Sequence, residues 1–399
     1  MQDETARDFS SVTAPVRFIP GDDPSRPLSP GIGLCLSGGG YRAMLFHLGG
    51  LIRLNEAGIL AHLKRISSVS GGSITAAVLG YKWKRLKFEA GVVTNLAAEV
   101  VAPVRQMAGQ TIDLWAVLKG VLLPGTVSER IEAMYDKTLF HGATLQDLPA
   151  DGEGPRFVIN ATNMQTGVLF RFSRPYMADW KVGVIKAPKV RLAKAVAASS
   201  AFPPVLSPCV LQVKPSDFDE RGRGELFQAP YNSRIVLADG GVYDNLGIET
   251  VWKEYQTVLV SDAGKVLSAE GEPKRDWLRH TYRVLEVINN QVVSLRKRQV
   301  IASFIDPKDE HDGTYWSVRS HVQDYGLADP IIPATPSQPQ TLVELAQTPT
   351  RLQQIELHYQ QKLLNWGYCI CDTAIRAHVD TAIPKGTLPY PDAPIARET

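Results

Sequence analysis

The sequence predicts a three-layer α/β/α fold with a mostly parallel central sheet. Two consecutive strand, turn and helix units near the start of the chain carry this prediction. In the first unit, the apolar run 31–36 leads through three glycines into a helical pattern over 41–57. In the second, the strand candidate 65–69 leads through a tight turn into a helical pattern over 73–86. Apolar runs without polar alternation are typical of strands that are buried on both faces.

The rest of the chain supplies further elements of both kinds. The β-rich stretch 156–173, with a turn at Thr166-Gly167, predicts a strand followed by a hairpin arm. Other strands are expected at 235–238 and 257–261, and helices at 88–121 with a break near Gly109, 190–199, 277–305 and 350–378. Asp239 and Asp262 follow the two late strands at their carboxyl ends, where open α/β sheets place their sites.

The composition describes a globular protein that does not bind nucleic acid. The 399 residues are 44% hydrophobic, and 43 basic against 41 acidic residues leave a net charge of +2, with no long basic run to follow phosphates. Four cysteines are too few and too unevenly spaced for a disulfide framework, and Cys369-x-Cys371 alone is a poor zinc site. Because no signal peptide or membrane-spanning run is evident, we expect a cytoplasmic protein.

Ser70 is the first candidate site residue, within Ser68-Val69-Ser70-Gly71-Gly72 at a strand-to-helix turn. Small neighbours let such a turn close tightly, which exposes the serine Oγ above the free N–H groups of the helix. The pattern indicates a nucleophile elbow, although Ser68 stands where G-x-S-x-G has its first glycine. The alternative is a serine N-cap that only opens a packing helix.

The glycine loop of residues 37–42 (SGGGYR) is the second candidate. Successive backbone N–H groups at a helix N-terminus can hold a developing oxyanion or a phosphate. A nucleotide loop is a weak alternative, because the segment matches neither G-x-x-x-x-G-K-[ST] nor G-x-G-x-x-G. A glycine turn that serves only tight packing is the other alternative.

Asp239-Gly240-Gly241 is the third candidate. The two glycines permit a close approach of backbones, which would bring the carboxylate within hydrogen-bonding reach of a serine on a neighbouring strand end. Taken alone, an aspartate that caps a turn is an equally good interpretation.

In this order and spacing, the three motifs resemble those of the patatin-like phospholipase family. SGGGYR is similar to the family's glycine-rich oxyanion loop, SVSGG to its nucleophile elbow and DGG to its catalytic aspartate motif. The stretch 197–208 (AASSAFPPVLSP) resembles the family's Ala-Ser-x-Ala-x-Pro segment, and SGGGYRAM is similar to the opening of the cytosolic group IV phospholipases. The resemblance covers approximately residues 30 to 265 and implies a patatin-like fold.

The resemblance implies a lipid acyl hydrolase that cleaves (lyso)phospholipid esters through an acyl-enzyme, without metal or organic cofactor. It assigns Ser70 as the nucleophile and Asp239 as its base, a dyad without histidine. Arg42 would either steer a lipid phosphate or brace the loop. The oxyanion donors would be the backbone N–H groups of four glycines, Gly38, Gly39, Gly40 and Gly71.

Two alternatives stay open. One is a Ser-Asp-His hydrolase with the chain order of α/β-hydrolases, for which five later histidines are available by order, His280, His311, His321, His358 and His378. The other is a scaffold on the same fold that binds an anionic ligand or lipid without turnover. His47 is expected to be a packed core residue. Asp244 and Asn245 are interpreted as N-caps, and Asp262 as a cap or loop brace.

We expect three parts along the chain, a flexible tail 1–30, a catalytic domain 31–330 and a C-terminal helical extension 331–399 packed on the core. The amphipathic helix 277–305 carries the basic cluster 296–298, interpreted as a solvated face with anionic headgroups as the alternative. The expected partners are a phospholipid or lysophospholipid substrate and, peripherally, a membrane surface. The near-neutral charge makes any such attraction local and apolar.

Overall fold

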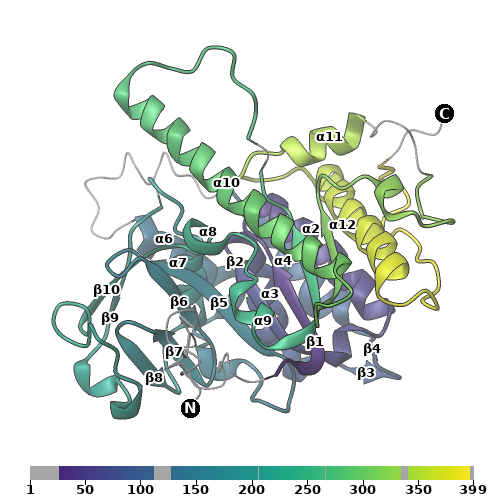
Figure 1. Ribbon diagram of the computed structural model, residues 1–399. Coiled ribbons are helices and arrows are strands. Elements are labelled where there is room, and N and C mark those ends of the chain that lie inside the picture. The colour runs from purple at the N-terminus through teal and green to yellow at the C-terminus, as the bar shows by residue number, and fades with distance from the viewer. Residues whose placement is uncertain (1–26, 112–126, 205, 266, 334–339, 396–399) are drawn as a thin grey trace, which may run out of the picture.

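A ten-stranded mixed sheet forms the centre of the structure, a computed structural model shown in Figure 1. The structure describes residues 27–111, 127–204, 206–265, 267–333 and 340–395. The predicted tail 1–30 lies almost wholly outside the described residues, and so does the end of the helical block expected over 88–121.

The main path of the sheet follows the order β12-β11-β1-β2-β5-β6-β7-β8. Strands β12 to β5 run parallel, and β6 to β8 continue as an antiparallel meander. The bounds are β1 Ser29–Leu36, β2 Leu63–Val69, β5 Arg156–Asn163, β6 Val168–Phe172, β7 Tyr176–Asp179, β8 Gly183–Lys186, β11 Tyr255–Asp262 and β12 Asp312–Ser317. The two consecutive strand-helix units and the hairpin arm after β5 are confirmed.

Two strands lie off the main path. β10 (Arg234–Asp239) pairs antiparallel with the last residues of β5, and β9 (Cys209–Gln212) pairs antiparallel with β10. The sequence predicts β10 as a strand but says nothing of its direction, because its partner lies about 75 residues away in the chain.

Helices cover both faces of the sheet, which confirms the three layers (Figure 1). They are α2 Gly40–Glu56, α3 Gly71–Lys82, α4 Ala102–Ala108, α6 Val127–Tyr135, α7 Leu192–Ser199, α8 Gly241–Asp244, α9 Glu249–Trp252, α10 Trp277–Ile305, α11 Gln340–Gln347 and α12 Leu357–His378. Alternate residues of β1 enter different hydrophobic clusters, Leu34 and Leu36 one with α2 and α3, and Cys35 another with α9 and α10.

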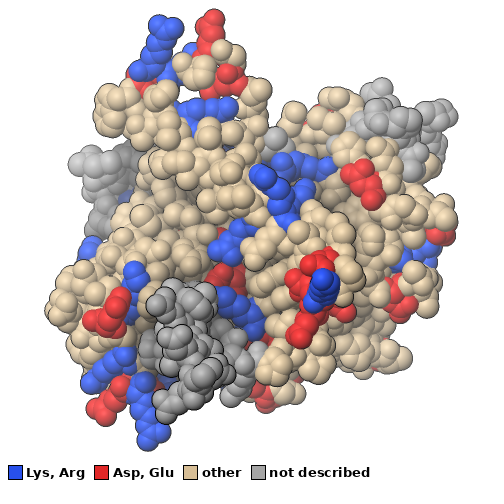
Figure 2. Space-filling view, in the orientation of Figure 1, with Lys and Arg blue, Asp and Glu red and all other residues tan. Residues whose placement is uncertain are grey.

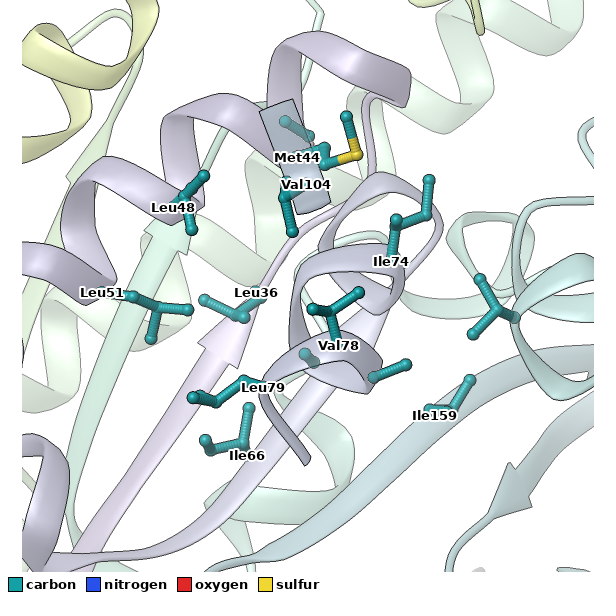
Figure 3. Close-up of a cluster of buried hydrophobic side chains, with 14 of the residues drawn as sticks. Leu36, Met44, Leu48, Leu51, Ile66, Ile74, Val78, Leu79, Val104 and Ile159 are labelled. Carbon is teal, nitrogen blue, oxygen red and sulfur yellow. The ribbon is translucent and has the colours of Figure 1, made fainter. Parts of the chain in front are cut away.

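The larger cluster fixes the two helices that begin at the candidate site. Figure 3 shows Met44, Leu48 and Leu51 of α2 and Ile74 and Val78 of α3 directed into one buried layer. Burial of such side chains stabilises the fold by about 1.5–3 kcal/mol each. The N-termini of α2 and α3 are thereby held side by side above the carboxyl ends of β1 and β2.

Two local expectations are wrong. Residues 88–93 form the hairpin β3 (Phe88–Glu89) and β4 (Val92–Val93) instead of the start of a helix. The turn between them places Ala90 and Gly91 at positive φ, which a helix cannot accommodate. The helix expected over 350–378 begins only at Leu357, as α12.

Helix α12 packs closely against α2. A Cβ added at Gly49 would lie 2.0 Å from the Leu364 carbonyl oxygen, and one at Gly367 would lie 1.9 Å from the Phe46 carbonyl oxygen. Glycine at both positions therefore lets the two backbones touch. A buried ion pair, Arg53 Nε to Asp372 Oδ1 at 2.7 Å, ties the same helices together.

We predict that Gly49→Ala lowers the free energy of unfolding by about 1–3 kcal/mol, because its methyl group must push α12 away. Gly50→Ala is the matched control, since the nearest atom to its Cβ is Trp316 Nε1 at 3.7 Å. The Gly50→Ala substitution should be neutral or stabilising, because alanine has a higher helix propensity than glycine. Chemical denaturation of both variants measures the difference, and equal effects would contradict the close packing.

Candidate active site

The carboxyl ends of β2 and β10 meet head to head along one edge of β5. Val69, the last residue of β2, pairs with Asn160, and Asp239, the last residue of β10, pairs with Ala161. The other edge of β5 is occupied by β6 over 159–163. Ser70, which follows Val69, is therefore brought beside Asp239 across 169 positions of sequence.

Ser70 lies on a strained strand-to-helix turn. Its φ of 51° and ψ of −120° are unfavourable for a residue with a side chain, and such strain persists only where surrounding contacts hold it. Ser70 occupies the N-cap position of α3, but its side chain makes no capping hydrogen bond. The geometry fits the nucleophile elbow better than the simple N-cap.

The stretch 197–208 holds both loops in place. The hydroxyl of Ser199 accepts a hydrogen bond from the Ser70 backbone N–H at 2.9 Å. The Ala201 carbonyl accepts from the Asp239 N–H at 2.9 Å, and the Ser199 carbonyl from the Gly240 N–H at 3.3 Å. This segment therefore sets the separation of Ser70 and Asp239.

Asp239 is a buried carboxyl group, 2% exposed. Its Oδ1 accepts a hydrogen bond from the Gly241 N–H at 2.7 Å, whereas Oδ2 has no partner of regular geometry among the described residues. Burial raises the pKa of Asp239, whereas hydrogen bonding by the Gly241 N–H and the nearby Ser70 hydroxyl lowers it. The raising effect is larger and brings the pKa to about 7. A carboxyl group with this pKa can take and return a proton at neutral pH.

The glycine loop touches the elbow backbone directly. A Cβ at Gly71 would lie 2.1 Å from the Gly40 carbonyl oxygen, so these two loops have no room for a side chain between them. In the part of the chain that the structure describes, no acceptor takes the N–H groups of Gly39, Gly40 or Gly71. The Gly38 N–H differs, because it already donates to the Asn245 carbonyl at 3.1 Å.

Arg42 is fully buried and braces the loop. Its guanidinium donates to the Ala263 carbonyl from Nε at 3.0 Å and from Nη2 at 2.7 Å, and to Thr350 Oγ1 at 3.2 Å. It also donates to the Thr348 carbonyl. Of the two roles expected for Arg42, this arrangement fits bracing rather than the steering of a lipid phosphate.

Asn245 is the site residue that sequence reasoning misplaced. Asp244 does accept from the Leu246 and Glu249 N–H groups, as a cap would, but the Asn245 side chain caps nothing among the described residues. Asn245 Oδ1 lies 2.5 Å from the position of a Cβ at Gly38, and Ser70 Cβ lies 3.2 Å from that same position. Asn245 thus faces the elbow across the glycine loop, and no local sequence pattern indicates this.

The remaining candidates lie outside the dyad. Asp262 is fully buried and braces its loop by accepting from the Tyr315 hydroxyl at 2.6 Å and the Gly264 N–H at 2.7 Å. His47 is a core residue, bonded to Ser261 Oγ at 2.8 Å and the Ser37 carbonyl at 2.9 Å. Burial lowers the pKa of His47 to about 4, so it stays neutral at pH 7.

The later histidines do not complete a triad in this structure. Over the described residues, which include all eight histidines, none forms a hydrogen bond to Ser70 or Asp239. His280, on α10, bonds to the Lys274 carbonyl, and His311 stacks on Trp252 and bonds to Asp309. His321, His358 and His378 lie beyond β12, at the start of a short helix and at the two ends of α12.

Exposed apolar side chains flank the dyad. Phe202 follows Ala201, the residue that holds Asp239, and is 41% exposed; Val242 follows Gly241 and is 45% exposed. A cavity of about 720 Å³, lined by Ser29 and Arg156 among others, lies at the opposite, amino edge of the sheet and does not belong to this site. The exposed side chains that follow both segments holding Asp239 are therefore apolar.

A serine elbow facing a buried carboxyl group, on a three-layer α/β/α sheet, defines a class of α/β hydrolases with a serine nucleophile. Residues 34–252 match the patatin-like phospholipase family. This span exceeds half of the chain, and the protein belongs to the patatin-like phospholipase family. Comparison with curated proteins finds no match.

A solved structure shows a similar fold. Human GIVD cytosolic phospholipase A2 superimposes with a TM-score of 0.51 at 14% identity, over 88% of this chain and 60% of that one. VipD from Legionella pneumophila gives a TM-score of 0.32 at 14% identity, over 85% of this chain and 67% of that one. This chain spans less than two thirds of the human enzyme's chain.

We predict that Gly71→Ala lowers kcat/KM for ester hydrolysis by about 10²-fold or more. The added methyl group would displace the Gly40 backbone and with it the N–H groups that are free to bind an oxyanion; loss of one such donor costs about 10²–10³ in rate. Kinetics with a soluble ester test this, together with unfolding measurements. Full activity in a folded variant would contradict the close contact of the loops.

Proposed function

We propose that this lipid hydrolase cleaves acyl ester bonds of phospholipids or lysophospholipids through a Ser70-Asp239 dyad. The observation that supports this most directly is the strained Ser70 beside a buried carboxyl group whose Oδ2 has no regular partner. Catalytic hydrogen bonds are often incomplete before substrate binds, so Oδ2 is free to receive the Ser70 proton.

In the first half-reaction, Ser70 Oγ attacks the ester carbonyl carbon while Asp239 Oδ2 takes the hydroxyl proton. The negative charge moves to the carbonyl oxygen, where the N–H groups of Gly39, Gly40 and Gly71 would donate to it. When the tetrahedral intermediate collapses, the bond to the alcohol oxygen breaks and that oxygen takes the proton from Asp239. The acyl group is left on Ser70.

In the second half-reaction, Asp239 takes a proton from water as the water oxygen attacks the acyl carbon. The bond between that carbon and Ser70 Oγ then breaks, and Oγ recovers the proton from Asp239. The fatty acid leaves and the enzyme returns to its starting state. Asn245 and Arg42 take no part in these proton transfers and affect the reaction only through the position of the glycine loop.

The apolar surroundings support a lipid substrate. Phe202 and Val242 offer contact to an acyl chain beside Asp239. Peripheral contact with a membrane surface fits such a substrate, and four buried, free cysteines fit the proposed cytoplasmic location. A Ser-Asp-His triad and a scaffold without turnover are the outcomes against which the dyad is tested.

We predict that Ser70→Ala and Asp239→Asn each lower the rate of ester hydrolysis by at least about 10³-fold. The first substitution removes the hydroxyl that donates the proton, and the second removes the carboxylate that accepts it. A fluorophosphonate probe should label the wild type at Ser70. Alanine at each of the five later histidines should leave kcat/KM within about threefold. A large loss at one histidine would favour the triad, and full turnover by Ser70→Ala would exclude the dyad.

We also predict a pH profile governed by Asp239. Its pKa of about 7 means that the carboxyl group becomes protonated, and unable to accept the Ser70 proton, as the pH falls through 7. The kcat/KM should therefore fall about tenfold per pH unit below that value and be flat above it. Initial rates with a soluble ester between pH 5 and pH 9 measure this, and a flat profile down to pH 5 would contradict Asp239 as the base.

A further inference from the structure

Helix α10 leaves the body of the protein at one end only (Figure 1). Its C-terminal part is anchored, because Val300 is fully buried and Arg296 pairs with Glu249 of α9 at 3.0 Å. Lys297 lies over the Tyr315 ring at 4.7 Å. Two residues of the basic cluster 296–298 are therefore engaged with the body, and the N-terminal part of α10 projects beyond it.

The projecting part turns charged side chains toward the loop that precedes α10, residues 265–270. Arg283 donates to the Ser268 carbonyl at 2.7 Å and pairs with Glu270, and Glu286 pairs with Lys265 at 3.5 Å. A surface helix ordinarily turns its apolar stripe to the core. In this part of α10 the charged side contacts the preceding loop, and large apolar side chains remain exposed.

We name these side chains the outer face of α10. It comprises Trp277, Leu278, Tyr282, Val284, Leu285, Ile288, Val292 and Leu295, all exposed; Leu278, Leu285, Ile288 and Leu295 are 63%, 57%, 54% and 51% exposed. At 3.6 residues per turn these positions span an arc of about 160°, which contains no charged residue between 277 and 295. Figure 2 shows largely tan surface along this part, with charged side chains at its tip.

The width of the outer face favours a lipid surface over a second copy of the chain. Two paired helices bury a narrow seam at every third and fourth residue, whereas this arc is broader. Trp277 and Tyr282 at the projecting end are the residue types that suit the boundary between water and lipid.

The outer face is connected to the candidate active site. α10 packs against α8, which begins two residues after Asp239 and carries the exposed Val242. Acidic and basic residues are balanced at the tip, where Lys274, Arg275 and Arg279 stand beside Glu270, Glu272 and Asp276. Attraction to a surface would therefore be apolar rather than electrostatic.

We propose that the outer face of α10 docks on a phospholipid surface and holds the catalytic loops against it. This proposal rests on the proposed function for the identity of the substrate, but its test does not require turnover. Among the described helices, none is long and apolar enough to span a bilayer, so docking is at the surface.

The test uses the full chain with Ser70→Ala, mixed with phosphatidylcholine vesicles and separated by sedimentation. Leu285→Glu with Ile288→Glu should lower the vesicle partition coefficient about 100-fold, because burial of each side chain contributes on the order of tenfold. Raising the salt from about 0.1 M to about 1 M should not weaken binding, since no ion pairs are involved. Circular dichroism checks that the exposed substitutions leave the fold intact.

His280→Glu with Arg298→Glu is the matched control. Both residues are exposed on α10 outside the apolar arc, and the change adds more negative charge than the test variant. Binding should stay within about threefold of the parent. Equal losses in both variants, or none in the test variant, would overturn the proposal.

Sedimentation velocity without vesicles tests whether a second copy of the chain covers the outer face instead. A parent dimer that the test variant converts to a monomer, with no vesicle binding, would assign the outer face to a second copy and overturn the proposal. With Ser70 present, the test variant should hydrolyse a soluble short-chain ester at the parent rate. If the chain with Ser70 hydrolyses no ester while the Ser70→Ala parent binds vesicles, the proposed function fails and the docking surface stands.

Discussion

The structure depends on one constraint, the meeting of β2 and β10 end to end along β5. Both β2 and β10 pair with β5. Val69 and Asp239 therefore occupy neighbouring register positions, opposite Asn160 and Ala161. Hydrogen bonds of the ladder fix this register to a fraction of a residue, which no pair of flexible loops would achieve. The strand direction matters equally, because only an antiparallel β10 points its carboxyl end at that of β2.

Holding this site costs stability that other parts of the fold supply. Ser70 has an unfavourable backbone conformation, and the Asp239 carboxyl group is buried with one oxygen lacking a regular partner. Around them, α2 and α3 pack into one buried layer, Arg42 ties the glycine loop to Ala263 and Thr350, and α12 closes over α2. The C-terminal helices are in this sense part of what positions the chemistry.

The same arrangement places the proposed catalytic residues beside the proposed lipid-binding face. The loop after β10 carries Asp239 at its start and Val242 beside it, and α10 packs on the short helix that follows. An apolar face at this place needs no net charge to find a lipid surface, in agreement with a chain of net charge +2. The charged side chains of α10 pair with Glu249 of α9 and with the loop that precedes the helix.

The sequence by itself determined most of the elements and the candidate residues at their ends. Short-range signals suffice for this, since apolar runs, helical spacing and glycine turns placed Ser70 and Asp239 at strand ends. The tertiary structure alone decided the direction of β10, the burial of Arg42, the engagement of the Gly38 N–H and the place of Asn245. These features depend on pairings between residues far apart in the chain, and local composition carries no information on which distant backbone will lie alongside.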